Sequence, residues 1–213
     1  MSEVETDLFG EKIIVSSQGG ITKARDESVF RQIGASNHSE GESAGEDFYA
    51  TPPFAVEELL KLEEFSHKIL EPCCGMGHIG KVLEANGFEV DARDLIDRGY
   101  GKGGMDFLHF PDKGLDCDII TNPPYNLAKE FVEKSLDVIK NGHKVAMFLK
   151  IQFLEGKKRR ELFRNSPPVR VWVSSSRLSC GKNGVEWMPS VICYAWFVWV
   201  KGFKGSPTIG WWN

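Results

Sequence analysis

Short apolar runs alternate with amphipathic stretches from residue 51 onwards, and this pattern predicts alternating helices and strands. The expected helices cover residues 51–65, 78–87, 126–142 and 155–165. The expected strands cover residues 67–72, 88–95, 116–122, 143–150, 169–176 and 191–202. Alternating β and α units indicate a mostly parallel sheet with helices on both faces. The last run, "VICYAWFVWVKG", is apolar on both alternating faces, which is typical of a central strand.

Residues at the ends of the apolar stripes predict where helices begin and end. Thr51 is the expected N-cap of the first helix, with Pro52 in its first turn, and Asn126 is the expected N-cap of the third. Gly87 and Gly142 are the expected C-terminal stops, because glycine adopts the left-handed conformation that ends many helices.

The first 47 residues differ from the remainder in composition. They are rich in Ser, Gly, Glu and Asn and show little apolar periodicity, so we expect a polar N-terminal arm over 1–47 and one catalytic domain over 48–213. The net charge of −4 is unevenly distributed, since residues 150–213 hold 11 basic and 3 acidic side chains. Such a split allows a polyanion to be held on one side of an acidic protein.

Composition also limits the compartment and the chemistry. No apolar run reaches the ~18–20 residues that span a bilayer, and the acidic N-terminus is unlike a signal peptide. The 5 cysteines form neither a CxxC pair nor a Cys/His quartet. We therefore expect a cytoplasmic protein with reduced thiols, no membrane association and no bound metal; its oligomeric state stays open.

A glycine-bearing turn follows the first expected strand of the domain. In "EPCCGMGHIG", Gly75 and Gly77 allow a tight turn and close approach of a ligand, and the next helix presents its N-terminus there. Taken alone, this turn is as consistent with a structural connection as with a ligand loop. Glu71, just before it, would repel a pyrophosphate but could bind an ammonium group.

Two acidic positions follow the second strand. Asp94 can accept hydrogen bonds from both hydroxyls of a ribose, with Asp91 as a competitor. Asp106 could accept from an exocyclic amine of a bound adenine, with Phe107 beside the ring.

The tetrapeptide "NPPY", Asn122 to Tyr125, ends the third strand. The two prolines have fixed φ and no N–H, so the turn is stiff and displays the Asn122 side-chain oxygen and a backbone carbonyl as acceptors. Such a pair can grip both hydrogens of an –NH₂ group, while Tyr125 offers a flat face for stacking. Holding the delocalised lone pair of a conjugated amine toward an electrophile is worth several kcal/mol.

The succession "FYATPP", "EPCCGMG", "VDARDL", "MDFL" and "NPPY" resembles that of S-adenosylmethionine-dependent adenine-N6 DNA methyltransferases of the gamma-class and phage type. The likeness spans roughly residues 46–200. It implies a Rossmann-like class I methyltransferase with a seven-stranded sheet and an antiparallel C-terminal strand. It also implies S-adenosyl-L-methionine as cofactor and DNA as partner, with RNA left open.

The same resemblance implies roles for the matching residues. The cofactor would be held by Phe48, Tyr49, Thr51, Pro52, Glu71, Gly75, Gly77, Asp94, Asp106 and Phe107. The target amine would be held by Asn122, Pro123, Pro124 and Tyr125. The target base of a duplex would first have to leave the stack.

No separate target-recognition domain is visible, which departs from many members of that family. Substitutes are the basic stretch Lys157, Lys158, Arg159 and Arg160, and the segment that contains Arg177, Lys182, Asn183 and Trp187. The first set could neutralise phosphates and the second could reach into a groove.

Three other functions stay open. NPPY also occurs in methyltransferases that act on adenine in RNA or on a glutamine amide in protein. A non-catalytic nucleic-acid-binding module could share the fold. A nicotinamide dehydrogenase would use Gly75, Gly77 and Gly80 but would leave NPPY unexplained.

Overall fold

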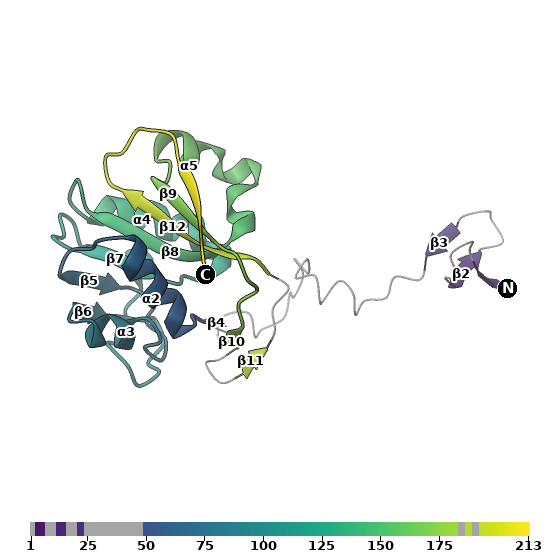
Figure 1. Ribbon diagram of the computed structural model, residues 1–213, viewed down its shortest axis with the longest axis horizontal. Coiled ribbons are helices and arrows are strands. Elements are labelled where there is room, and N and C mark those ends of the chain that lie inside the picture. The colour runs from purple at the N-terminus through teal and green to yellow at the C-terminus, as the bar shows by residue number, and fades with distance from the viewer. Residues whose placement is uncertain (1–2, 7–11, 16–20, 24–48, 183–185, 189–191) are drawn as a thin grey trace. The chain divides into compact units, whose positions relative to one another are not determined.

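The computed structural model describes residues 3–6, 12–15, 21–23, 49–182, 186–188 and 192–213 of the chain (Figure 1). The chain divides into two compact units, Met1–Glu40 and Gly41–Asn213. The first contains three antiparallel strands in the order β1 (Glu3–Thr6), β2 (Lys12–Val15) and β3 (Ile21–Lys23). The sequence pattern predicts none of these three strands.

A seven-stranded sheet forms the centre of the second unit, in the order β13-β9-β12-β8-β7-β5-β6. Its strands are β5 (Lys68–Glu71), β6 (Glu89–Ala92), β7 (Asp118–Thr121), β8 (Lys144–Lys150), β9 (Arg170–Ser174), β12 (Tyr194–Val200) and β13 (Thr208–Trp212). Only β12 runs antiparallel to its neighbours. The predicted mostly parallel sheet is confirmed, and so is the central place of the apolar strand.

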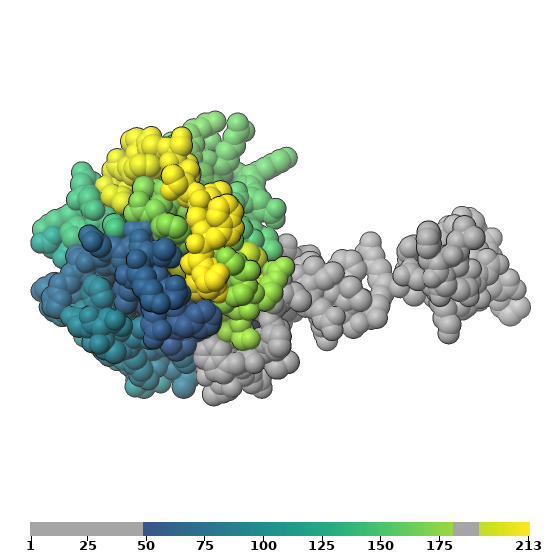
Figure 2. Space-filling view, in the orientation of Figure 1, coloured from purple at the N-terminus to yellow at the C-terminus, as the bar shows by residue number. Residues whose placement is uncertain are grey.

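The edge strand β13 is an addition to the predicted fold. It pairs in parallel with β9, and Gly210 lies so close to Trp172 that a Cβ there would be 2.2 Å from the indole ring. Trp212 is buried and its ring centroid lies 6.0 Å from that of Phe54; Figure 2 shows this C-terminal segment beside the blue residues of α2 (Pro53–Leu62). The five residues of β13 include one glycine and show no clear alternation of apolar and polar side chains. The strand therefore depends on these tertiary contacts.

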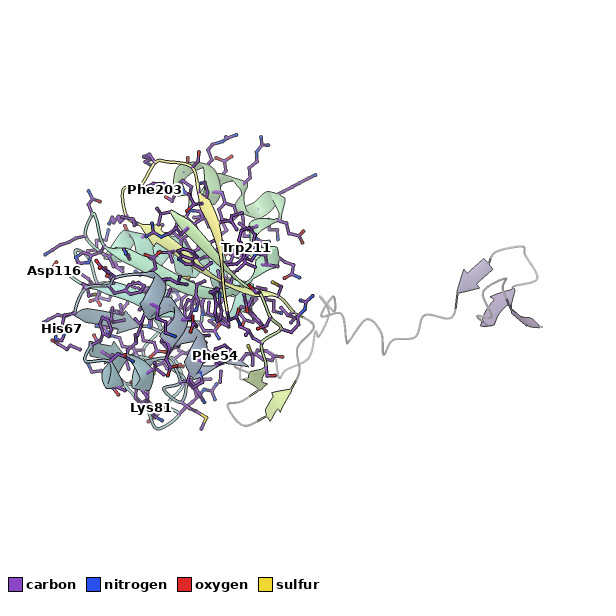
Figure 3. All side chains as sticks on the ribbon, in the orientation of Figure 1. Phe54, His67, Lys81, Asp116, Phe203 and Trp211 are labelled. Atoms are coloured by element: carbon purple, nitrogen blue, oxygen red, sulfur yellow. The ribbon has the colours of Figure 1, made fainter. Side chains whose placement is uncertain are left out.

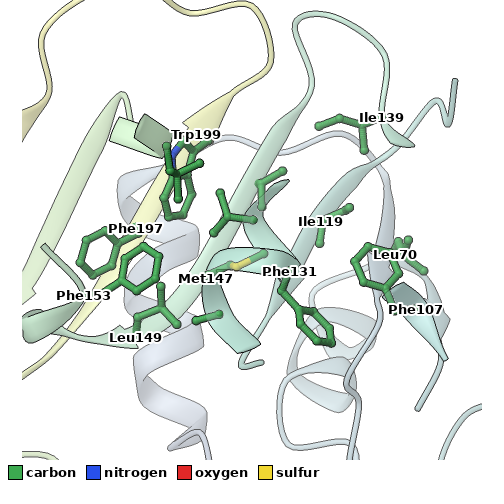
Figure 4. Close-up of a cluster of buried hydrophobic side chains, with 14 of the residues drawn as sticks. Leu70, Phe107, Ile119, Phe131, Ile139, Met147, Leu149, Phe153, Phe197 and Trp199 are labelled. Atoms are coloured by element: carbon green, nitrogen blue, oxygen red, sulfur yellow. The ribbon is translucent and has the colours of Figure 1, made fainter. Parts of the chain in front are cut away.

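Helices cover both faces of the sheet, as predicted. On one face lie α2 and α3 (Gly80–Ala85), and on the other lie α4 (Ala128–Val138) and α5 (Arg160–Asn165) (Figure 1). Figure 4 shows the core on the α4 side, where Phe131 of α4 lies near Met147 of β8, and Phe153 packs against Phe197 of β12. No helix in the described part of the chain is long and apolar enough to cross a membrane.

Both predicted N-caps are wrong, for local reasons. Pro52 is the N-cap of α2, and the Thr51 hydroxyl instead accepts a hydrogen bond from Asn122. Asn126 lies inside a short 3-10 helix, Tyr125–Leu127, so that Leu127 is the N-cap of α4. Gly87 does end its helix in the left-handed conformation, with φ 86°.

Charged side chains tie the elements together at the amino ends of the central strands. His143 lies between two carboxylates: its Nδ1 is 2.8 Å from Asp118 Oδ1 and its Nε2 is 3.0 Å from Asp116 Oδ1. Burial alone would lower the pKa of His143, but the hydrogen bonds to the two aspartates raise it above its ordinary value. The imidazolium form therefore stabilises the folded state.

We expect this contact to make stability depend on pH. A pKa raised by folding contributes stability that is fully present below the unfolded value, about 6.5, and is lost as pH rises through the folded value. In urea unfolding, the free energy of unfolding should therefore fall more between pH 5.5 and pH 8.5 for the wild type than for His143→Gln. The matched control is His67→Gln, since His67 is exposed on the same side of the domain as Asp116 (Figure 3). Parallel curves for wild type and His143→Gln would contradict the expectation.

Candidate active site

The carboxyl ends of the four parallel strands β5 to β8 define one edge of the second unit. Within a few residues after these ends, the chain exposes a large apolar side chain each time: Met76, Leu95, Leu127 and Leu154. The strand β4 (Tyr49–Ala50) lies at the same edge, where Asn122 contacts it (Figure 1). In open α/β sheets this edge is where ligands bind.

Asn122 links the NPPY turn to β4 and the start of α2. Its side-chain nitrogen donates to the Tyr49 carbonyl oxygen at 2.6 Å and to the Thr51 hydroxyl at 3.1 Å. An asparagine amide has two N–H donors and one oxygen. Because both donors are used inside the chain, the side-chain oxygen is the group that Asn122 can offer to a ligand.

The two prolines of the turn place a second acceptor nearby. The Pro124 carbonyl accepts from the Leu127 N–H at 3.0 Å and so closes the 3-10 turn. In the described part of the chain, no such donor reaches the Pro123 carbonyl. The Pro123 carbonyl is therefore a second acceptor of this turn that no described backbone N–H occupies, and Pro123 itself is buried.

Tyr125 lies among aromatic and basic neighbours. Its ring stacks on that of Tyr49, with centroids 6.3 Å apart and an interplanar angle of 21°. The Lys150 ammonium lies over the same ring, 4.8 Å from its centroid. Burial raises the pKa of the Tyr125 hydroxyl well above its ordinary value, and the neighbouring Tyr194 adds to the shift. Tyr125 is therefore a neutral aromatic surface.

The glycine turn after β5 has the tight geometry expected from its sequence. Gly75 and Gly77 both adopt positive φ, 53° and 81°. One Asp94 carboxylate oxygen accepts from the Gly75 N–H at 2.8 Å and the other from the Ile96 N–H at 2.9 Å. Asp94 thus joins the end of β6 to the glycine turn.

The competing acid, Asp91, lies within β6 and is held by two cations. Its side chain pairs with Arg93 at 2.5 Å and with Lys102 at 3.1 Å. Asp94 is therefore the acid that contacts the glycine turn.

Glu71 lies beneath the glycine turn. It is 1% exposed, and its Oε2 atom is buried without a hydrogen-bond partner among the described residues. Burial raises the pKa of its carboxyl well above the ordinary value, and Asp94 adds to the shift. Tyr100, which the sequence analysis misses, packs beside it: a Cβ on Gly80 would lie 2.1 Å from the Tyr100 oxygen and 2.7 Å from Glu71 Oε2.

Asp106 and Phe107 follow the second strand but face different surroundings. Asp106 caps the short 3-10 helix Phe107–His109 and contacts His109 at 2.7 Å. Phe107 is 5% exposed and packs against Phe131 in the core, with ring centroids 5.4 Å apart (Figure 4). Only Asp106 of this pair is partly exposed.

The strand at the end of the segment 177–182 lies beside β4. Strand β10 (Cys180–Lys182) pairs with β4 on one side and with β11 (Glu186–Met188) on the other, and Lys182 is opposite Tyr49 in the register. Arg177 lies in a surface hollow with Pro52. Phe48 and Asn183 fall outside the described residues, as do the side chains of Lys182 and Trp187.

The basic stretch before α5 divides into two kinds of residue. Lys157, Lys158 and Arg160 are exposed. The Arg159 guanidinium instead donates to the carbonyls of Gln152, Phe153 and Glu155 and lies over the Phe153 ring. Arg159 therefore stabilises the preceding turn, and three of the four basic side chains face solvent.

No family model and no curated protein matches the chain. Among solved structures, it is similar to a candidate RNA methyltransferase from Pyrococcus horikoshii, with TM-score 0.56 and 15% identity over 78% of this chain and 91% of that one. It is also similar to a candidate class I S-adenosylmethionine-dependent methyltransferase from Listeria monocytogenes, with TM-score 0.54 and 14% identity over 77% of this chain and 65% of that one.

A third similar structure is a modification subunit of a candidate type I restriction enzyme from Vibrio vulnificus. Its TM-score is 0.51 and its identity 14%, over 85% of this chain and 48% of that one, so this chain spans about half of that subunit. The second unit therefore has the Rossmann-like fold of class I methyltransferases, which confirms the predicted fold class.

We expect Gly80→Ala to destabilise the protein although Gly80 lies in a helix. Alanine is the better helix former, but at Gly80, the first residue of α3, its methyl group would overlap Tyr100 and Glu71. Overpacking of this kind costs about 1–3 kcal/mol. Thermal unfolding of Gly80→Ala, Tyr100→Ala and the double variant tests the cause. The double variant should lose less than the sum of the single losses, whereas additive losses would exclude a clash with Tyr100.

Proposed function

We propose that the protein transfers a methyl group from S-adenosyl-L-methionine to the N6 amine of adenine in DNA. The observation that carries the proposal is the oriented amide of Asn122. Both of its hydrogens are engaged by Tyr49 and Thr51, which leaves its oxygen as the group that can accept from a ligand. The arrangement suits an –NH₂ group on a conjugated ring.

The residues around the glycine turn fit the cofactor. The left-handed glycines permit backbone approach, Asp94 is bound to the turn through the Gly75 N–H, and the buried Glu71 carboxyl retains an unpaired oxygen. We assign cofactor contacts to these residues together with Tyr49, Thr51, Pro52 and Asp106, and to Phe48. The cofactor supplies a methyl group that a sulfonium has already activated. The chain needs neither a metal nor a covalent intermediate for this transfer.

The chain's own part in the reaction is positioning. The Asn122 oxygen and the Pro123 carbonyl accept the two amine hydrogens and favour the pyramidal nitrogen that can attack. Tyr125 supplies the stacking surface, and Pro124 keeps the turn rigid. An adenine in a duplex reaches this site by leaving the stack.

Phosphate contacts are a further part of the proposed DNA binding. We assign them to Lys157, Lys158 and Arg160, and to the segment of Arg177, Lys182 and Asn183. Arg159 is omitted because its guanidinium is bound to chain carbonyls.

We expect Asn122→Ala to lower methyl transfer at least 100-fold, because misplacement of an attacking atom by about 1 Å has that effect. Labelled methyl from S-adenosylmethionine is offered in parallel to duplex DNA, single-stranded DNA, total RNA and mixed protein, and the products are digested for N6-methyladenine. Cofactor affinity, measured by calorimetry, should fall much less than methyl transfer, and an unchanged melting temperature would report an intact fold. The control Asn126→Ala alters an exposed asparagine of the same turn and should keep activity.

The outcomes separate the competing functions. Label in DNA adenine supports the proposal, and label in RNA adenine or in protein glutamine moves the acceptor to that class. Cofactor binding without label in any substrate favours a binding module. Near-normal turnover of Asn122→Ala would overturn the assigned role of the amide.

The basic stretch gives a second expectation, on salt dependence. The double variant Lys157→Gln/Lys158→Gln should bind DNA more weakly and flatten the plot of log affinity against log salt by up to about 0.9 per lost contact. Arg159→Gln should leave that slope unchanged and lower the melting temperature, because its hydrogen bonds hold the turn. If the double variant and wild type show equal salt slopes, the basic stretch does not bind phosphates and is only a solvated surface.

A further inference from the structure

Lys150 is a charged side chain of the site that the proposed mechanism does not use. It is the last residue of β8, the strand next to the one that delivers NPPY. Its ammonium lies 4.8 Å from the centroid of the Tyr125 ring, and the residue is only partly exposed. The ammonium thus lies over the ring on which a target base is proposed to stack.

Several other partly buried cations of the domain have carboxylate partners, and Lys134, Arg159 and Lys201 donate to backbone carbonyls. Lys144, at the opposite end of β8, pairs with Glu63 at 2.9 Å, and Arg93 pairs with Asp91 and Asp112. Among the described residues, no carboxylate lies within ion-pair distance of the Lys150 ammonium. Burial lowers the pKa of Lys150, which shows that its charge is held at a cost in free energy.

An uncompensated cation beside a binding surface indicates that the ligand brings the anion. A base that stacks on Tyr125 has to displace the ammonium from the ring, and the flexible lysine stem lets it move aside. A nucleotide carries a phosphate as well as a planar ring, whereas the amide of a glutamine side chain is neutral. The cofactor is a weaker source of the anion, because its glycine turn follows β5 and β7 lies between β5 and β8.

We propose that Lys150 binds a backbone phosphate of the target nucleotide, so that the acceptor is a nucleic acid strand. This inference rests on the proposed function and names the substrate class of the same site. Lys150 acts as a substrate-binding residue that exchanges the Tyr125 ring for the phosphate when the base enters.

The test compares salt dependence in Lys150→Gln, Lys150→Arg and wild type. The probe is a fluorescein-labelled single-stranded DNA oligonucleotide that contains adenine, and fluorescence anisotropy is measured with S-adenosylhomocysteine at 50–200 mM KCl. One lost phosphate contact lowers the slope by about 0.7 for a single strand, so wild type should lose about 2.5-fold more affinity than Lys150→Gln over this range. Lys150→Arg keeps the charge and should keep the slope.

The matched control is Lys113→Gln. Lys113 is an exposed lysine before β7, at the amino ends of the strands, and its removal should leave the slope unchanged. Melting temperatures and cofactor affinities of all variants show whether the fold is intact. An unchanged salt slope in Lys150→Gln would overturn the inference. A fall in cofactor affinity as large as the fall in DNA affinity would also overturn it, because the anion would then belong to the cofactor.

Failure of this inference is distinguishable from failure of the proposed function. If wild type methylates DNA but Lys150→Gln has the same salt slope as wild type, the role of Lys150 is wrong and the proposed function stands. If wild type binds no nucleic acid and labels protein, both are overturned.

Discussion

The two hydrogen bonds donated by the Asn122 side chain determine much of the proposed site. They connect the end of β7 to the Tyr49 carbonyl, 73 residues earlier in the chain, and to the Thr51 hydroxyl, 71 residues earlier. An amide that is not held can turn its N–H₂ group toward a ligand as readily as its oxygen. Because both donors are occupied, only the acceptor side is presented, and an amine is favoured over a carbonyl as ligand.

The two ends of the sheet use charge differently. At the amino ends, the buried Glu63 carboxylate accepts from Arg170, Lys144 and the Trp172 indole, and so ties the end of α2 to β8 and β9. At the carboxyl ends, Glu71 retains an unpaired oxygen, and the Lys150 ammonium has no carboxylate partner in the described part of the chain. Polar groups removed from water without partners cost free energy, so Glu71 and Lys150 are more consistent with ligand binding than with stability.

The fold could be predicted from the sequence where periodicity is strong, and the site where a motif is local. The apolar runs of β5, β7, β8 and β12 are unambiguous, and NPPY directly follows one of them. Strand β13 was missed because its pairing depends on the close approach of Gly210 to Trp172. Lys150 was missed because a lysine at a strand end looks like a solvated residue until the strand order brings it to Tyr125.

The glycine turn shows why its sequence was ambiguous between structure and ligand binding. The sheet ends at β6, so the described loop after Asp94 forms the outer wall of this region, and its Tyr100 ring packs on the turn. A Cβ at Gly77 would lie 2.6 Å from that ring, and one at Gly80 would meet its oxygen. These two glycines are therefore required by packing whether or not a ligand binds. Gly75 also has a positive φ, 53°, and its N–H is bound by Asp94, the acid proposed to hold the ribose. The ligand argument thus rests on Gly75 and Asp94 rather than on the glycine spacing as a whole.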